Sequence, residues 1–331
     1  MLALLEGAES GAGPGVLVGS LAALGAAALW AFGSFLFSRA MAPVPGRAAL
    51  TPAAANLFKN TSAALLFGAI WWGMGHAGPS GAAWVSLGVS GLLGFAVGDA
   101  LYFAAFSRCG VQLAALAANL IPPLAALIDF VWFGRALSGL GLVSMGVTMA
   151  GIALVVSERP RGRVGEPARD PKQRRIGIAF ASLAAAAQAV AIVTGRAGFE
   201  GTELLPGTVA RLAGGVLGAL VIALLLGIWQ RTVRRRGPGP ADEVRLLARP
   251  FVLPALAAAL IPACLIGAWL NLPLHSLALG ALAPGVSGVL FATVPLFALP
   301  IGMALGERYG WRTAVGTGIA FLGVVGVIRF T

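Results

Sequence analysis

The chain has 331 residues, of which 58% are hydrophobic and only 11% are charged, and its mean hydropathy is +0.90. Soluble globular domains carry about 25% charged residues, so this composition excludes a soluble domain and indicates an integral membrane protein. The formal net charge of +11 does not indicate a nucleic-acid partner, because most basic residues lie in the connections between apolar segments.

Ten apolar segments are long enough, or nearly so, to cross a membrane as helices, since about 20 residues span about 30 Å of hydrocarbon. The 47 glycines and 20 prolines are tolerated in membrane helices, where small residues let helices approach closely. The same small-residue faces offer a contact for a homodimer. We predict an all-α integral membrane protein with ten transmembrane helices at 16–38, 52–74, 84–106, 111–133, 138–157, 176–199, 204–228, 252–278, 285–305 and 312–329.

Two of these segments carry charges at the same predicted depth. Lys59 lies seven residues into the second segment, and Asp99 lies seven residues before the end of the third. Because consecutive helices are antiparallel, both lie about 10 Å from one membrane edge, and Trp30 and Asn119 fall in the same layer. Charges inside a membrane helix are costly and normally face a cavity or a partner. Two interpretations remain open: a polar substrate site, or a structural pair that neutralises two buried charges.

The connections between segments carry an asymmetric charge. Of 23 lysine and arginine residues, 18 lie in the odd-numbered connections, most densely in the linkers 158–175 and 230–249. The positive-inside rule therefore predicts that these linkers are cytoplasmic and that both termini lie outside. The excess of arginine over lysine, together with abundant alanine and glycine, favours a bacterial inner membrane. Membrane lipid is a further expected partner of the basic linkers.

The first five segments resemble the second five, which indicates an internal duplication. Residues 15–23, GVLVGSLAA, return as residues 177–185, GIAFASLAA. An odd number of spans in each repeat makes the two repeats inverted relative to each other, as in many secondary transporters. The predicted domains are an N-terminal tail at 1–15, a first five-helix repeat at 16–157, a basic linker at 158–175 and a second five-helix repeat at 176–329.

Repeat equivalence extends the set of candidate residues, since Lys59 corresponds to Arg211 and Asp99 to Asn271. Cys109 and Cys264 form neither a disulfide framework nor a metal set, and no phosphate-binding loop is found, so we predict no catalytic residue, metal or cofactor. The candidate substrate-binding residues are Trp30, Asn56, Lys59, Asp99, Tyr102, Asn119, Gln188, Arg211 and Asn271.

These residues and one further motif resemble the EamA-type members of the drug/metabolite transporter superfamily. The similar features are Ala28-Leu29-Trp30, the basic Lys59, the stretch from Tyr102 to Ser107, and Pro295 followed by Gly306-Glu307-Arg308. The resemblance covers about 16–329. It implies a ten-helix secondary transporter with a central cavity that moves a small polar metabolite, such as an amino acid, by alternating access. Relatives commonly have their termini inside, which differs from the orientation that this chain's charges predict.

Two other functions remain open. Gly88-Val89-Ser90-Gly91 and Gly285-Val286-Ser287-Gly288 are similar to the serine motif of rhomboid-type intramembrane proteases. Such an enzyme pairs its serine with a histidine, and this chain offers only His76 and His275. Small-residue helix packing explains both motifs equally well. A non-transporting membrane scaffold or lipid-handling protein is the other alternative.

Overall fold

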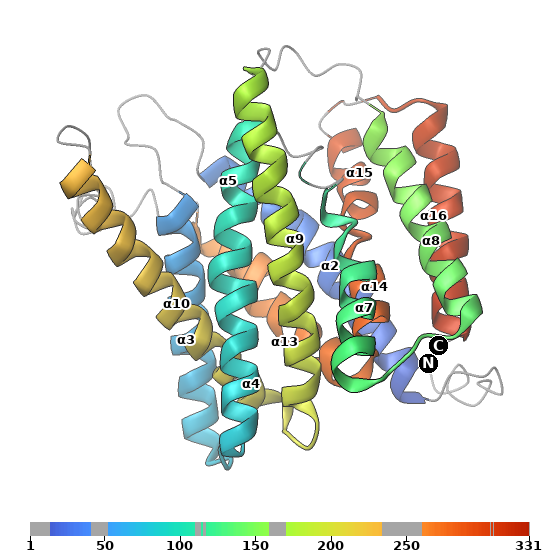
Figure 1. Ribbon diagram of the computed structural model, residues 1–331. Coiled ribbons are helices and arrows are strands. Elements are labelled where there is room, and N and C mark those ends of the chain that lie inside the picture. Colours follow the sequence, from blue (N-terminus) through green and yellow to red (C-terminus); the bar gives the residue numbers. More distant parts are fainter. Residues whose placement is uncertain are drawn as a thin grey trace.

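The computed structural model of the protein describes residues 14–40, 52–109, 114, 117–158, 170–233, 260–304, 306 and 308–330. Within this part of the chain the architecture is a bundle of helices with no strand (Figure 1). The first half contains α2 (Pro14–Ala40), α3 (Pro52–Met74), α4 (Gly81–Gly91), the π-helix η1 (Leu92–Gly98), α5 (Asp99–Cys109), α7 (Ile121–Phe133) and α8 (Gly139–Ser157).

The second half contains a corresponding series of helices. It contains α9 (Pro171–Phe199), α10 (Leu204–Val233), the π-helix η2 (Leu265–Leu270), α13 (Asn271–Ala281), α14 (Pro284–Phe291), α15 (Val294–Ala304) and α16 (Trp311–Phe330).

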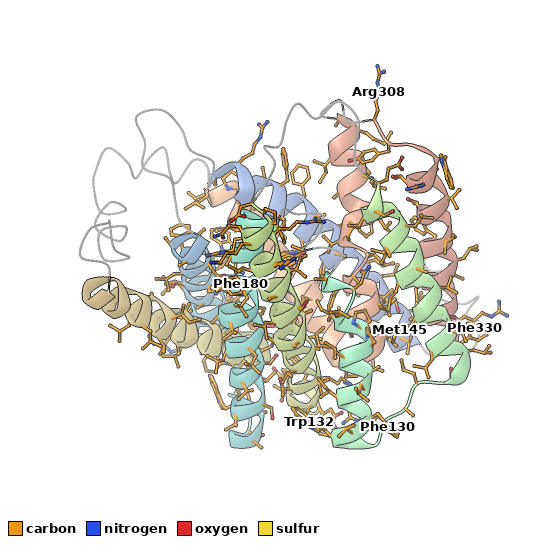
Figure 2. The ribbon with its side chains drawn as sticks, turned by 45° about the horizontal axis from the view of Figure 1, so that its top comes forward. Phe130, Trp132, Met145, Phe180, Arg308 and Phe330 are labelled. Atoms are coloured by element: carbon orange, nitrogen blue, oxygen red, sulfur yellow. The ribbon has the colours of Figure 1, made fainter. Side chains whose placement is uncertain are left out.

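Each of the ten predicted segments contains a helix. Within the described residues, eight helical stretches are long and apolar enough to cross a membrane, and Ile121–Phe133 is a shorter apolar helix. Large apolar side chains such as Phe130 and Trp132 on α7, each 55% exposed, point away from the bundle and would contact lipid (Figure 2). The protein is a multi-pass membrane protein, and the predicted all-helical fold class is confirmed.

The two halves run in opposite directions. In Figure 1, α2 begins at the lower end of the bundle, whereas its repeat equivalent α9 begins at the upper end. The packing follows the same symmetry: α8 packs along α16 and α3 along α10, each against its own equivalent, and α7 packs against α14, the first part of the fourth helix of the other repeat. In addition, α2 packs against η2 and α13, as α9 packs against η1 and α5. The repeats therefore interlock rather than form two separate bundles.

The third helix of each repeat contains a π-helical turn, which the sequence did not predict. The π-helix η1 ends directly before Asp99, and η2 ends directly before Asn271, the equivalent residue of the second repeat. A π-helix bonds each N–H to the carbonyl five residues back, is rarely stable in long runs and often occurs at functional sites. Both π-helices thus place one polar side chain at an equivalent point of each half.

The fourth helix of each repeat is interrupted. Residues 117 and 118 are helical, residues 119 and 120 form a turn, and α7 then begins at Ile121 with Pro122 and Pro123 in its first turn. In the second half, α14 ends before Thr293 and α15 restarts at Val294, next to Pro295. Proline fits the first turn of a helix but interrupts the interior of one, which explains both breaks.

Two glycines belong to the motif that resembles the EamA-type transporters and to its copy in the first repeat. Gly134 follows α7 with φ of 67°, and Gly306 follows α15 with φ of 85°. This left-handed conformation is strained for residues with a Cβ atom and is the usual way to end a helix. The glycine of the Gly-Arg and Gly-Glu-Arg sequences is therefore required by the backbone, whereas Glu307 lies outside the described residues.

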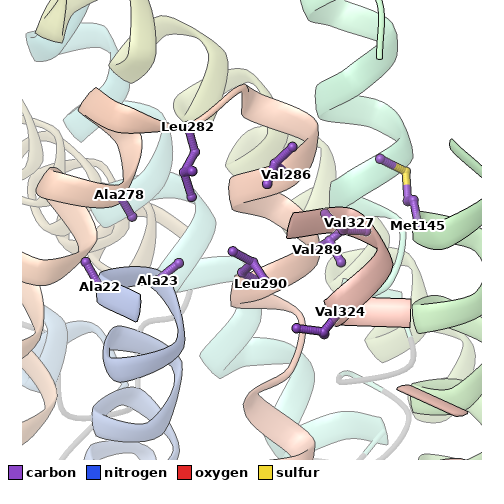
Figure 3. Packing of buried hydrophobic residues seen from close by; sticks show 10 residues of the cluster. All are labelled: Ala22, Ala23, Met145, Ala278, Leu282, Val286, Val289, Leu290, Val324 and Val327. Atoms are coloured by element: carbon purple, nitrogen blue, oxygen red, sulfur yellow. The ribbon is translucent and has the colours of Figure 1, made fainter. Parts of the chain in front are cut away.

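A hydrophobic cluster joins the two halves on the side away from α3 and α10. Ala22 and Ala23 of α2 meet Leu282 near the end of α13, and Val289 and Leu290 of α14 continue the cluster toward α8 and α16 (Figure 3). All five side chains are buried. Dispersion contacts of this kind, rather than the hydrophobic effect, hold helices together in lipid.

Close approach of α4 and α10 yields the first prediction. A Cβ atom at Gly91 would collide with the backbone carbonyl of Arg211, while a Cβ atom at Gly68 would meet nothing within 4 Å. We expect Gly91→Ala to destabilise the folded protein by about 1–3 kcal/mol, the usual cost of overpacking. Gly68→Ala should be neutral or slightly stabilising, because alanine is the better helix former. Thermal unfolding in detergent, followed by size-exclusion chromatography, measures both; equal stabilities would contradict the packing.

Candidate functional site

A cavity of about 400 Å³ lies between the two repeats. One end is lined by Glu158 and Tyr309, next to the end of α8 and the start of α16, and His275 of α13 lines the cavity further inside the bundle. Alanine and other aliphatic side chains form most of its wall, and aromatic and polar side chains lie among them. Its principal aromatic and polar lining residues are Trp30, Lys59, Asn60, Phe95, Asp99, Tyr102, Glu158, Gln188, Asn271, His275, Phe291 and Tyr309.

An ion pair between Lys59 of α3 and Asp99 of α5 lies in the wall of this cavity. The Lys59 Nζ atom donates to Asp99 Oδ2, and both side chains are buried. The second oxygen, Oδ1, accepts a hydrogen bond of 3.1 Å from Gln188 Nε2 on α9. The ammonium also lies 5.2 Å from the centre of the Trp30 ring. Each carboxylate oxygen of Asp99 therefore has a partner: Lys59 from the first repeat and Gln188 from the second.

The carbonyl groups of η1 explain why amide side chains surround this ion pair. The Gly94 carbonyl accepts a hydrogen bond of 3.2 Å from Gln188 Nε2. The Phe95 carbonyl accepts bonds of 2.8 Å from Asn56 Nδ2 and 3.1 Å from Asn60 Nδ2. Carbonyl groups without a good partner are costly inside a membrane, so side chains from α3 and α9 support the π-helix.

A second polar cluster is centred on Arg211 of α10, which is only 1% exposed. Its Nε atom donates to Ser90 Oγ at 3.1 Å, and its Nη1 atom lies 3.2 Å from His275 Nδ1. The guanidinium also lies 4.6 Å from the centre of the Phe95 ring. The His275 ring is stacked on Phe291 with 4.2 Å between ring centres. Lys59 and Arg211 thus approach the same Phe95 side chain.

The nine predicted site residues fall into two groups. Six of them line the cavity: Trp30, Lys59, Asp99, Tyr102, Gln188 and Asn271.

The remaining three, Asn56, Asn119 and Arg211, are buried behind the cavity wall. Asn119 lies next to the lining residue Ala118, and among the described residues neither polar atom of its amide has a hydrogen-bond partner. Asn271 lines the cavity and also donates to the Ala26 carbonyl at 2.6 Å.

Glu158 and His275 are two of the lining residues that were not among the nine predicted ones. Glu158 ends the first repeat, and its Oε2 atom accepts hydrogen bonds from the backbone N–H of Thr313 at 2.8 Å and from its hydroxyl at 2.7 Å. A carboxylate is favourable there, because the first turn of α16 presents unpaired N–H groups. His275 is the other. It follows Asn271 by four residues, which places both side chains on one helix face, and this spacing could have predicted that His275 lines the cavity.

Residues 17–157 match the model of the EamA-like transporter family. This segment is similar to one repeat of an EamA-like transporter. A solved crystal structure has the same fold, with a TM-score of 0.66 and 17% sequence identity, over 93% of this chain and 95% of that one. In total, 28 chains of solved structures match, whereas no curated protein matches the sequence. The family indicates a membrane transporter of the drug/metabolite type, and EamA-like proteins are transporters rather than enzymes.

The serine motifs have structural partners in this EamA-like fold. Ser90 Oγ donates to the Ala191 carbonyl at 2.6 Å, and Ser287 Oγ donates to the Ala278 carbonyl at 3.5 Å. A nucleophilic serine needs a neighbouring base, yet no serine–histidine hydrogen bond is found in the part of the chain that the structure describes. The Nδ1 atom of His275 lies against Arg211 instead. The motifs serve helix packing, which does not favour a protease.

The ion pair yields the second prediction. Lys59→Met or Asp99→Asn alone should each lower the free energy of unfolding by about 3–5 kcal/mol, because each leaves one buried charge without its partner. The double variant should lose less than the sum of both. Thermal unfolding and folded yield of the four proteins form a double-mutant cycle, and strictly additive losses would show that the two side chains do not interact.

Proposed function

We propose that the protein is a secondary transporter that moves a small polar metabolite, such as an amino acid, across the bacterial inner membrane by alternating access. The observation that carries the proposal is a cavity of about 400 Å³ between inverted repeats, with the Lys59–Asp99 ion pair in its wall. Small-molecule sites in proteins enclose about 300–1,000 Å³, so the cavity suits a metabolite of this size.

The interrupted helices support alternating access. The π-helices η1 and η2 and the break between α14 and α15 all contribute residues to the cavity wall. Transporters built from inverted repeats place their substrate between the repeats and use discontinuous helices at the site. Local changes at such breaks let one repeat rock against the other while the bundle stays folded.

The distribution of described basic residues supports the predicted orientation. Arg39 lies in the last turn of α2, Arg108 in the last turn of α5 and Arg174 near the start of α9. Figure 1 places the start of α9 at the upper end of the bundle, and Arg308 projects from that end in Figure 2. The cavity lining reaches this end through Glu158. By the positive-inside rule, this end is cytoplasmic and the cavity faces inward. Most residues of the two basic linkers, 158–175 and 230–249, lie outside the described residues.

The orientation yields the third prediction. A reporter enzyme that is active only outside the cytoplasm should work when it is fused after Thr331. The same reporter should be inactive when it is inserted within 160–174, in the basic linker. Cell-based reporter activity measures both fusions. The opposite pattern would overturn the orientation and leave the helical fold unaffected.

The fourth prediction tests transport itself. Purified protein in liposomes should move radiolabelled amino acids down their concentration gradient, and a screen of single amino acids will identify the preferred one. Trp30→Ala should reduce the initial rate at least about tenfold, since Trp30 lines the cavity beside Lys59. The matched control is Trp72→Ala, because Trp72 is 86% exposed and lies outside the cavity. Failure of every amino acid and related small metabolite to cross would refute the proposal.

A further inference from the structure

At two pairs of repeat-equivalent positions, the buried polar residues of the two halves differ by one charge. Lys59 and Arg211 are equivalent cations, each seven residues after the first residue of its helix. Asp99 is an acid, but its equivalent is the neutral Asn271. The Lys59 charge is balanced by Asp99, whereas Arg211 forms no ion pair among the described residues. The four equivalent positions, occupied by Lys59, Asp99, Arg211 and Asn271, therefore carry one net positive charge.

The partners of Arg211 are neutral or aromatic: Ser90, the Phe95 ring and His275. An unbalanced cation within a membrane is expensive, and such residues are usually kept for function. Of the partners, Phe95 and His275 line the cavity, while Arg211 itself lies behind the wall. His275 is thus the polar group that connects this charge to the cavity.

Arg211 determines where the proton of His275 lies. A guanidinium has only donors, so the Nδ1 atom at 3.2 Å from Arg211 Nη1 must accept a hydrogen bond. The proton of the neutral imidazole is then on Nε2, which becomes a donor. In the described part of the chain Nε2 has no hydrogen-bond partner, and stacking on Phe291 fixes the orientation of the ring.

We propose that His275, polarised by Arg211, binds a carboxylate group of the transported metabolite. An N–H donor with a cation directly behind it favours an anionic acceptor, and charge-assisted hydrogen bonds are the strong ones. The carboxylate would also balance the charge of Arg211. The rest of the ligand would contact the aromatic wall formed by Trp30, Tyr102 and Phe291. This inference rests on the proposed function, since it assigns the substrate class of the same cavity.

Three probes with one phenyl framework test the inference. Phenylpropanoate has only the carboxylate, phenethylamine has only the ammonium group, and phenylalanine has both. Equilibrium binding of each radiolabelled probe to the detergent-purified full chain is measured by scintillation proximity. We expect phenylpropanoate and phenylalanine to bind at least about tenfold more tightly than phenethylamine. Equal binding of phenethylamine, or no binding of any probe, would overturn the inference.

Variants assign the effect to His275. His275→Phe keeps an aromatic ring against Phe291 but has no N–H, so carboxylate binding should weaken at least about tenfold. His275→Gln retains a donor and should keep part of the binding, which a purely structural role of the ring would not produce. His76→Phe is the control, because His76 lies outside the cavity and pairs with Glu203. Unchanged binding in His275→Phe would contradict the inference.

If His275→Phe does not fold, the ranking of the three probes on the unaltered protein and the His275→Gln variant still decide the outcome. Because binding is measured without transport, the two proposals fail separately. Carboxylate binding without any flux in liposomes would refute the transporter and leave the binding site. Flux of metabolites without preference for a carboxylate would refute the site and leave the transporter.

Discussion

A carboxylate inside a membrane protein must be compensated, and the pairing of Asp99 with Lys59 is the constraint on which the site depends. The cost of an unpaired buried charge fixes the depth and rotation of α3 against α5. Gln188 of α9 donates a hydrogen bond of 3.1 Å to the second oxygen of this carboxylate. Asp99 of the first repeat is therefore bonded to a residue of the second repeat. The π-helix η1 brings Asp99 to this position and presents the carbonyls that Asn56 and Gln188 satisfy.

The internal duplication accounts for the helices that both repeats share. The candidate site arises where the two repeats differ in their polar residues. Both repeats contain a π-helix, an interrupted fourth helix and a left-handed glycine after it. Only the first repeat has an acid at the end of its π-helix, whereas the second has Asn271 there and His275 one turn later. A symmetric ion pair in each half would leave the core neutral. Because the second repeat has the neutral Asn271 in place of an acid, the charge of Arg211 is not balanced by an equivalent partner.

The sequence predicted the elements well, because membrane helices are long, apolar and separated by charged connections. It also predicted the common depth of Lys59 and Asp99, since counting residues from helix ends suffices in antiparallel helices. The π-helices were not predicted, because one additional residue in a turn hardly changes an apolar pattern. The cavity wall was predicted only in part, since tilt and rotation decide whether a residue such as Asn119 lines it or lies behind it. The predicted domain boundaries stay predictions.

The central claim is that the cavity between the repeats is accessible from each side of the membrane in turn. Ala118, at the break before α7, lines the cavity and is a suitable position for a single cysteine after Cys109 and Cys264 have been replaced. The measurement is modification of this cysteine by a membrane-impermeant thiol reagent in right-side-out and inside-out vesicles. Alternating access predicts modification from both sides, and modification from one side only would contradict it.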